Sequence, residues 1–435
     1  MPTRRRQIWS WAFYDFANSA YTTLIVTFVY AVFFTQQIAA DPIIGTTQWA
    51  HAVALSAIVV ALVSPFVGTA ADNLSGPARH TTFVLLTALT VALTSLLYLP
   101  LPGQVLFALT VFVLSDIFFE VSGVIYNSYL PRIAPQAIIG RISGYGWALG
   151  YVGGLLAMAL ALFAFVQPEQ PWFGLSRESG QNYRATALLV AIWYAVFSVP
   201  MFLWLRGNGS AAPSFPLVEA LRRTPGQLAA TFRQLRGFRD VFQLLVARLI
   251  YNDGVVTIFA FGPIYASETF DFTFTELMLW GVALNVTAGL GAYLMGILDD
   301  KIGGKKTIAI TLAGLTLGTL MAVSASNKTW LWIAGIIVGI FIGPNQAASR
   351  SLLGRFVPPG KESEFYGFFA FSGKAMAFLG PLLLGIATAH FESQRAGIAT
   401  ILGFFLLGGL LLAGVNERRG IETAARPAEP PPSSA

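Results

Sequence analysis

Residues 296–305 read GILDDKIGGK, and a related segment, GTAADNLSG, occupies residues 68–76. Asp300 and Asp72 hold the same place in the two segments, which are offset by 228 residues. Each segment follows a long apolar stretch, so each is expected to mark the end of an apolar helix. A repeat at this distance, in a chain of 435 residues, predicts two halves built to the same plan.

The composition excludes an ordinary soluble protein. Hydrophobic residues make up 55% of the chain and charged residues only 11%, and the mean hydropathy is +0.65. Soluble domains carry about 25% charged residues, so much of this surface must face something other than water. The net charge of +6 therefore does not indicate a nucleic-acid partner. The chain has no cysteine and three widely separated histidines, so we expect no metal site and no cofactor.

Membrane-spanning helices account for the apolar surface. Such a helix needs about 20 largely apolar residues, because every backbone group must be hydrogen-bonded internally. Twelve stretches meet this requirement: 8–37, 50–70, 81–100, 104–126, 138–166, 184–206, 241–266, 275–297, 307–326, 329–350, 362–390 and 395–416. We therefore predict an all-α integral membrane protein with twelve transmembrane helices.

The distribution of lysine and arginine predicts the orientation in the membrane. With the N-terminus in the cytoplasm, 21 of the 27 basic residues, Arg350 among them, fall on the cytoplasmic side. Four fall on the outer side, and Arg248 and Lys374 lie inside spans. Cytoplasmic loops of membrane proteins are enriched in basic residues, so both termini are expected in the cytoplasm.

A polar stretch at residues 207–240 separates the first six spans from the last six. A second repeat supports this division: residues 128–135 match residues 351–358 at an offset of 223, and Gly144 falls on Gly367 at the same offset. The predicted organisation is a six-helix bundle at 1–206, a cytoplasmic linker at 207–240, a second six-helix bundle at 241–416 and a disordered cytoplasmic tail at 417–435.

The loop motif resembles the signature of the major facilitator superfamily, in which Gly-x-x-x-Asp is followed by basic residues and glycine. The second copy fits this pattern at Gly296, Asp300 and Lys301, whereas the first has Asn73 in place of the basic residue. The resemblance implies two six-helix bundles in the major facilitator fold. It also implies alternating access to a site between the bundles.

Five further segments resemble the hallmarks of a narrower group, the autophagy-related vacuole effluxer branch and its bacterial relatives. They are WAFYDFANSAY at 11–21, RISGYGWALGYVGG at 141–154, YNDG at 251–254, SRSL at 349–352 and FYGFFAFSGK at 365–374. The resemblance implies a uniporter or an ion-coupled transporter, and the role associated with the branch is efflux of neutral amino acids.

Charged residues at the helix ends predict a cytoplasmic gate. Asp72 is expected to pair with Arg132, and Asp300 with Arg355, because each half ends its second and fourth spans with these residues. The resemblance implies that each aspartate also faces the N-terminus of a helix in the other half, where the helix dipole favours an anion. The alternative is that all four are solvated loop charges.

Polar and ionisable residues inside the spans predict the substrate or coupling cavity. Ionisable residues are costly in the bilayer and therefore usually functional. The candidates are Asp15, Asn18, Ser19, Asp116, Glu120, Arg248, Asn252, Asp253, Asn345, Gln346 and Lys374. Asp116 and Glu120 are four residues apart and cannot both ionise cheaply, which suits a protonatable site. Permanently paired structural salt bridges are the alternative, and it applies most directly to Lys374.

These observations predict a secondary transporter that moves a small polar solute, with neutral-amino-acid efflux as the role implied by the resemblance and proton coupling left open. The sequence contains no Walker-type phosphate loop, which excludes direct use of ATP by this chain. Transport of lipids or amphipathic drugs, a membrane-embedded enzyme and a receptor are the alternatives. The expected partners are the small-molecule substrate, protons and the lipid bilayer, but no nucleic acid. A monomer in the plasma (inner) membrane is expected.

Overall fold

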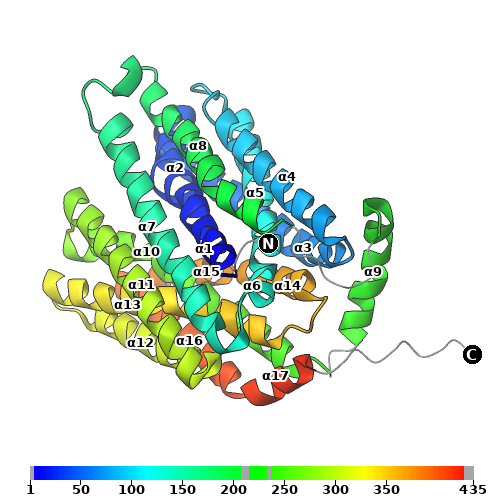
Figure 1. Ribbon diagram of the computed structural model, residues 1–435. Helices are drawn as coiled ribbons and strands as arrows, with labels where there is room; N and C mark the ends of the chain where they lie inside the picture. Colours follow the sequence, from blue (N-terminus) through cyan, green and yellow to red (C-terminus); the bar gives the residue numbers. More distant parts are fainter. Residues whose placement is uncertain (1–3, 207–214, 234–236, 426–435) are drawn as a thin grey trace, which may run out of the picture.

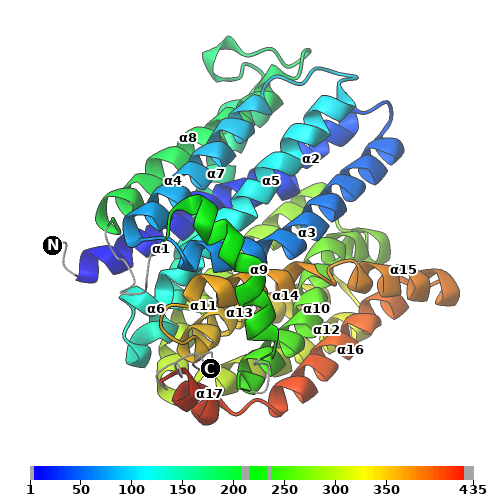
Figure 2. The ribbon, with the colours of Figure 1, turned by 90° about the vertical axis from the view of Figure 1, so that its right-hand side faces the viewer.

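The computed structural model describes residues 4–206, 215–233 and 237–425. These residues form helices and no strand, in two bundles that lie against each other (Figures 1 and 2). Within this part of the chain, twelve helical stretches are long and apolar enough to cross a membrane. The predicted all-α fold with twelve spans is confirmed.

The first bundle contains the first six spans. Their helices are α1 (Arg4–Ala20) with π-helical Tyr21–Phe28, α2 (Tyr30–Phe33) and π-helical Phe34–Ile38, then α3 (Pro42–Asp72), α4 (Gly76–Leu96), α5 (Val105–Ser128) with α6 (Leu130–Ile133), α7 (Ile139–Ala161) with π-helical Leu162–Val166, and α8 (Gln181–Trp204). Short 3₁₀ turns at Gln136–Ile138 and Trp172–Gly174 lie in its connections.

The second bundle contains the last six spans. Its helices are α10 (Arg239–Phe270), α11 (Phe274–Ile302), α12 (Gly304–Ser324), α13 (Lys328–Phe356), α14 (Glu362–Lys374) with α15 (Leu379–Phe391), and α16 (Gln394–Ala413). Two helices lie outside the twelve stretches that can cross a membrane: α9 (Leu217–Arg233) between the bundles and α17 (Glu417–Ala424) after α16.

The eleventh span is interrupted in the middle. α14 ends at Lys374 and α15 begins at Leu379, with turns between them. Pro381 lies in the first turn of α15, where its missing N–H group costs nothing, whereas a continuous helix would lose a hydrogen bond there. The break therefore leaves free carbonyl groups at the end of α14 and free N–H groups at the start of α15.

The ends of the bundles form two faces. We call the end that carries Arg4, Arg132, Arg141, Arg355 and Arg419 the basic face, and the other end the opposite face. The first turn of α1 lies at the basic face, where Arg4 donates to the Ile133 carbonyl at 3.0 Å. α17 lies there too, because Arg419 binds Asp240, the second residue of α10, at 2.6 and 2.8 Å.

One domain prediction needs correction. The segment 417–435 was expected to be disordered, but residues 417–424 form α17, which packs on the second bundle. The side chain of Asn416 caps this helix by accepting from the Arg419 N–H at 3.0 Å, and the Arg419–Asp240 pair then fixes it. Residues 426–435 lie outside the described part of the chain.

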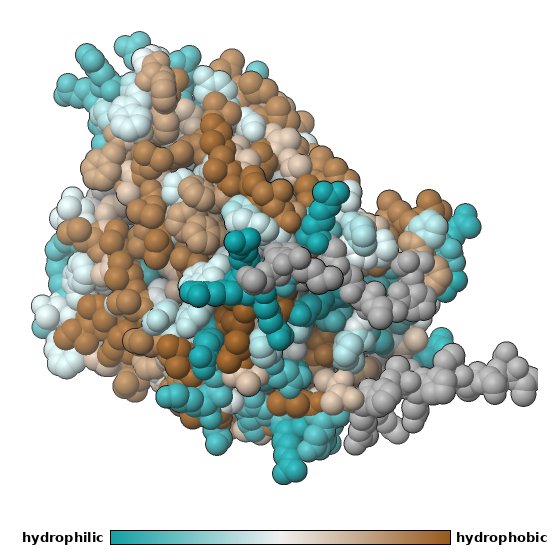
Figure 3. All heavy atoms as spheres, in the orientation of Figure 1, coloured by the Kyte–Doolittle hydropathy of each residue, from teal (hydrophilic) through white to brown (hydrophobic). Residues whose placement is uncertain are grey.

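The flanks of the bundles are apolar. Leu62, Leu106 and Leu410 are 71%, 80% and 72% exposed. Figure 3 shows hydrophobic atoms along the helices and hydrophilic atoms concentrated near their ends. A surface of this kind is what a membrane-embedded bundle presents to acyl chains.

Candidate functional site

The ends of α3 and α14 form one junction between the bundles at the basic face. Asp72, the last residue of α3, accepts hydrogen bonds from the backbone N–H groups of Ser363 and Glu364 at 3.1 and 2.8 Å. Both belong to the first turn of α14, where free N–H groups and the helix dipole favour a carboxylate. Arg132 lies 3.3 Å from Asp72 and 2.6 Å from Glu362. The expected Asp72–Arg132 pair is therefore present, and it is bonded to the second bundle.

The ends of α11 and α7 form an equivalent junction. Asp300 accepts from the backbone N–H groups of Gly140 and Arg141 at 2.9 and 3.3 Å, and from Arg141 Nε at 2.5 Å. Arg355, its expected partner, lies 3.7 Å from Asp300 but only 2.6 Å from Asp299. The predicted Asp300–Arg355 pair is therefore present, but it is the longer of the two contacts that Arg355 makes with these aspartates. Consecutive helical residues point in different directions, so Asp300 bonds the first bundle while the hydrogen bonds of Asp299 stay within its own.

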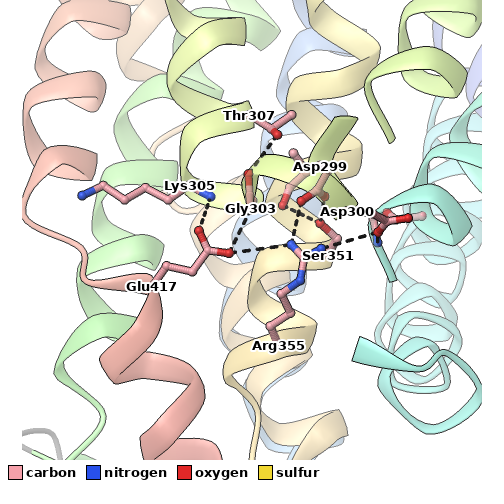
Figure 4. A network of polar contacts seen from close by, with 12 residues as sticks. Asp299, Asp300, Gly303, Lys305, Thr307, Ser351, Arg355 and Glu417 are labelled. Atoms are coloured by element: carbon pink, nitrogen blue, oxygen red, sulfur yellow. Dashed lines mark hydrogen bonds and ion pairs between the residues drawn. The ribbon is translucent and has the colours of Figure 1, made fainter. Parts of the chain in front are cut away.

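The C-terminal helix completes this second junction, as Figure 4 shows. Glu417, at the start of α17, accepts from the backbone N–H groups of Gly304 and Lys305 at 2.9 and 3.0 Å, which caps α12. Its carboxylate also lies 3.9 Å from Arg355, and Arg355 lies between it and Asp299. The tail predicted to be disordered therefore supplies a charge to the network.

Glycines let the bundles approach closely beside both junctions. A Cβ atom added to Gly296 of α11 would lie 3.1 Å from the Cα atom of Gly144 in α7. One added to Gly367 of α14 would lie 2.8 Å from the Cα atom of Pro65 in α3. At 2.8 Å the backbone would have to shift, and at 3.1 Å it would have to yield by a few tenths of an ångström. Because Gly144 and Gly367 are repeat equivalents, the sequence repeat becomes two equivalent helix crossings.

Loss of the Asp300 charge is expected to open the basic face. In Asp300→Asn, the bonds to the first turn of α7 weaken, and charged hydrogen bonds contribute about 1.5–3 kcal/mol each. We expect faster labelling of Ser128→Cys by a maleimide reagent added from the basic side. Ser128 is a suitable reporter because it is buried at the α3–α14 junction, where its hydroxyl bonds that of Ser363 at 3.0 Å.

Glu276→Gln is the control for this prediction, because its partner Lys328 lies at the opposite face. Labelling of Ser128→Cys at the same rate in Asp300→Asn and in the control would contradict a gating role for Asp300.

Arg350 of α13 also joins the bundles, at a position further from the basic face than the two junctions. Its Nη1 atom donates to Asp15 Oδ2 at 2.9 Å and to Asn127 Oδ1 at 3.3 Å. Its Nε and Nη2 atoms donate to the hydroxyl and carbonyl oxygens of Ser143 at 2.9 and 2.8 Å. The guanidinium carbon lies 4.6 Å from the centre of the Trp11 ring. All four partners belong to the first bundle, so one side chain from the second bundle is bound entirely by the first.

The position of Arg350 differs from the sequence-based expectation, which placed it among the cytoplasmic residues. The tenth span does not end at residue 350, because α13 continues to Phe356. Arg350 is therefore inside the span and only 3% exposed. The polar residues Asn345 and Gln346, about one turn earlier, were a signal that this end of the helix is not lipid-facing.

A second ion pair crosses between the bundles near the middle of the spans. Lys374 Nζ, at the end of α14, lies 2.7 Å from Glu120 Oε1 in α5. Their side chains are 31% and 25% exposed. Asp116, one turn away, is buried and accepts from the Ser56 hydroxyl at 2.6 Å. Two carboxylates therefore share the neighbourhood of a single lysine.

Three residues of α10 bind the interrupted span beside its break. Arg248 donates to the Phe369 carbonyl of α14 at 2.8 Å, and Asn252 donates to the Gly373 carbonyl at 3.2 Å. Asp253 Oδ2 accepts from the Gly380 N–H at the start of α15 at 2.8 Å. Asp253 thus faces the start of a helix, where free N–H groups favour a carboxylate. Arg248 and Asp253 therefore face another helix and not each other.

The remaining predicted residues do not form one cluster. Gln346 donates to Asn252 at 2.9 Å and joins the group around the interrupted span. Asn345 instead bonds α12 within its own bundle at 3.0 Å. Asn18 and Ser19 are half-buried on α1, and the Ser19 hydroxyl bonds its own helix at 2.8 Å.

A cavity of about 580 Å³ lies between the bundles toward the opposite face. Its walls are mostly apolar and include Phe28, Leu162, Phe259, Trp280, Leu284 and Val338. Polar atoms come from Gln36, Tyr183 and Asn285. None of the eleven residues predicted for the cavity is in this lining. The predicted residues lie closer to the basic face. In α10, which begins at that face, Asp253 comes five residues before Ile258, and Ile258 belongs to the cavity lining.

Comparisons with known proteins agree with this architecture. The family described as "Vacuole effluxer Atg22 like" matches residues 136–425. The "Uncharacterized MFS-type transporter YxiO" of Bacillus subtilis is 25% identical over 420 residues, covering 95% of this chain and 96% of the relative. "Autophagy-related protein 22-1" of Neosartorya fischeri is 27% identical over 323 residues, covering 68% of this chain and 51% of the relative. The chain thus spans about half the length of that fungal relative.

Solved structures show the same fold at low sequence identity. The proton:xylose symporter XylE bound to 6-bromo-6-deoxy-D-glucose has a TM-score of 0.74 and 13% identity, with 96% of this chain and 97% of that chain covered. A bacterial homologue of the iron transporter ferroportin in the outward-facing state has a TM-score of 0.70 and 12% identity, with 95% and 99% covered. The multi-pass membrane fold and the family match together show that this chain belongs to the Atg22-like family of major facilitator superfamily transporters.

Proposed function

We propose that the chain is a secondary transporter that exports neutral amino acids by alternating access. One observation carries the proposal. In the described part of the chain, the ion pairs that join the bundles lie between the basic face and the middle of the spans, whereas the cavity lies toward the opposite face. The bundles are therefore held together at one end and separated at the other, which is one of the two states that such a transporter requires.

The Glu120–Lys374 pair suits a zwitterionic substrate. An amino acid carries an ammonium and a carboxylate group, so it can exchange partners with a carboxylate and an ammonium that lie 2.7 Å apart. Both side chains are partly exposed, so they are open to such an exchange. The apolar walls of the cavity then offer a place for an uncharged side chain. Release of this inter-bundle pair by substrate would also permit the bundles to move.

Asp116 is the proposed proton-coupling residue. Asp15 is paired with Arg350 and Glu120 with Lys374, whereas Asp116 has no ion-pair partner among the described residues. A buried carboxylate without its own cation is costly, and binding of a proton removes that charge. In this proposal the proton is taken up at Asp116 while Glu120 and Lys374 hold the substrate.

The orientation and setting are proposed from the charge distribution. The basic face is the cytoplasmic side, as enrichment in arginine indicates. The cavity then belongs to an outward-facing state, in agreement with the state named for the ferroportin homologue. We place the transporter in the plasma (inner) membrane as a monomer, with bundles at 1–206 and 241–416.

Transport of amphipathic compounds is the second candidate, because the walls of the cavity are mostly apolar. Proteoliposomes containing the full chain separate the two. Preloaded neutral amino acids should exchange with labelled external ones, and a pH gradient should accelerate the flux. Exchange of an amphipathic dye without any amino-acid exchange would instead favour the second candidate. Failure of both would overturn the proposed substrate classes.

Two variants are expected to divide substrate binding from proton coupling. Glu120→Gln should weaken amino-acid exchange, because it removes the carboxylate that would bind the ammonium group of the substrate. Asp116→Asn should retain exchange between equal amino-acid concentrations but lose the response to a pH gradient. The measurement is initial flux with and without the gradient. Glu276→Gln, in a surface pair at the opposite face, should leave both fluxes unchanged. Loss of exchange in Glu120→Gln and Asp116→Asn alike would contradict the division of roles.

A further inference from the structure

Helix α9, in the connection between the bundles, buries one side against the protein. Ala220, Thr224 and Thr231 are fully buried, and their spacing of four and seven residues places them on one side of the helix. α9 packs against α3. Figures 1 and 2 show it lying across the ends of the spans and not alongside them. It is therefore held at the edge of the basic face.

The contacts of α9 reach both bundles at the α3–α14 junction. The side-chain amides of Gln227 and Asn73 bond each other at 2.6 and 2.9 Å, and Asn73 directly follows α3. Lys361, directly before α14, donates to the Thr231 hydroxyl at 3.1 Å. α9 thus bridges the two elements that Asp72 joins.

A second side of α9 is apolar and uncovered. Leu217, Val218 and Leu221 are 56%, 64% and 40% exposed. Arg222 and Arg233 border this side and are exposed as well. In Figure 3, hydrophobic and hydrophilic atoms lie next to each other on the segment at the right-hand edge of the molecule, where α9 is found. Three arginines and a single glutamate make the helix basic.

We propose that α9 is an interfacial helix whose apolar side inserts into the headgroup region of the membrane and whose arginines bind anionic lipid. Helices that combine an apolar side with bordering basic residues lie in this way at membrane surfaces. Charge complementarity selects anionic lipid as the occupant, and the bilayer that surrounds the spans supplies it. This contact holds α9 beside both halves of the junction, so anionic lipid favours the state in which the basic face is closed.

Two neighbouring alanines of α9 allow a matched test. Each can be replaced by a cysteine that is then the only one in the chain, because the chain has none of its own. Ala229 lies eleven residues after Val218 and Ala230 eleven after Glu219, and eleven residues are about three helical turns. Ala229 is therefore on the apolar side and Ala230 on the charged side, and both are exposed. A fluorophore is attached to Ala229→Cys or Ala230→Cys of the full chain in vesicles of phosphatidylglycerol and phosphatidylcholine with brominated acyl chains.

Bromine should quench the fluorophore at position 229 about two-fold more than at position 230. The difference should shrink in vesicles of phosphatidylcholine alone, and in Arg222→Gln/Arg233→Gln, because both changes remove the charge attraction. Equal quenching by aqueous iodide at both positions would show a solvated helix and overturn the proposal. Protection of position 229 from bromine and iodide alike would show a protein partner there and overturn it too. Neither readout depends on transport, so the result is independent of the proposed substrate.

Discussion

Replacing Gly367 with alanine is expected to shift the transporter toward a state open at the basic face, with a large loss of transport. The added methyl group would lie 2.8 Å from the Pro65 Cα atom in α3, and backbone atoms cannot yield as a flexible side chain can. Overpacking of this kind costs about 1–3 kcal/mol. Since about 1.4 kcal/mol is a factor of ten in an equilibrium constant, the ratio of closed to open molecules falls roughly five- to hundred-fold.

The sign of this effect is informative, because glycine-to-alanine changes in a helix normally stabilise it by about 1 kcal/mol. Gly403→Ala in α16 is the matched control, since nothing lies within 4 Å of its added Cβ atom. The measurements are flux in proteoliposomes and maleimide labelling of Ser128→Cys. Gly144→Ala, at the equivalent crossing of α7 and α11, should reproduce the result. Normal flux and labelling in Gly367→Ala would contradict the close crossing as part of the closed state.

Replacing Arg350 with methionine is expected to abolish transport and to lower stability by about 3–5 kcal/mol, the usual cost of leaving one member of a buried ion pair alone. Arg350 is 3% exposed, and its guanidinium binds Asp15, Asn127 and Ser143 from the other bundle. Arg350→Lys should recover stability in part, because it restores the charge but not the planar set of donors.

The double variant Asp15→Asn/Arg350→Met separates the two consequences. It removes the stranded carboxylate, so we expect thermal stability to recover while transport stays lost. Arg418→Met is the control, because the Arg418 side chain is 91% exposed and pairs only with Glu422 one turn away among the described residues. Wild-type flux in Arg350→Met would show that this contact is dispensable.

The sequence predicted the features that depend on local pattern. The twelve spans follow from apolar length, and the two halves follow from the repeated Asp72 and Asp300 loops. The Asp72–Arg132 pair could be expected because each residue ends a helix at the same face. The bonds of Asp72 to the first turn of α14 agree with the family resemblance, which implied that this aspartate faces the N-terminus of a helix in the other half.

The features that sequence reasoning missed depend on distances between helices. Nothing in residues 329–350 shows that α13 continues to Phe356, and this continuation alone turns Arg350 from a surface charge into a buried one. Asp299 was overlooked beside Asp300 because the direction of each side chain depends on the helix phase. The walls of the cavity are apolar residues that a sequence cannot distinguish from lipid-facing ones. The α17 helix was missed because its stability comes from Asp240 and the start of α12.

The central claim is that the two bundles tilt about their junctions so that one face closes as the other opens. Spin labels on the cysteine-free chain test it through two distances between the ends of α7 and α11. Ala137→Cys with Lys301→Cys reports the basic face, and Gln170→Cys with Thr275→Cys reports the opposite face; all four positions are exposed. Double electron–electron resonance in nanodiscs, with and without neutral amino acid, should show the first distance lengthening as the second shortens. Distances that stay fixed at both faces, or that change together in the same direction, would contradict the account.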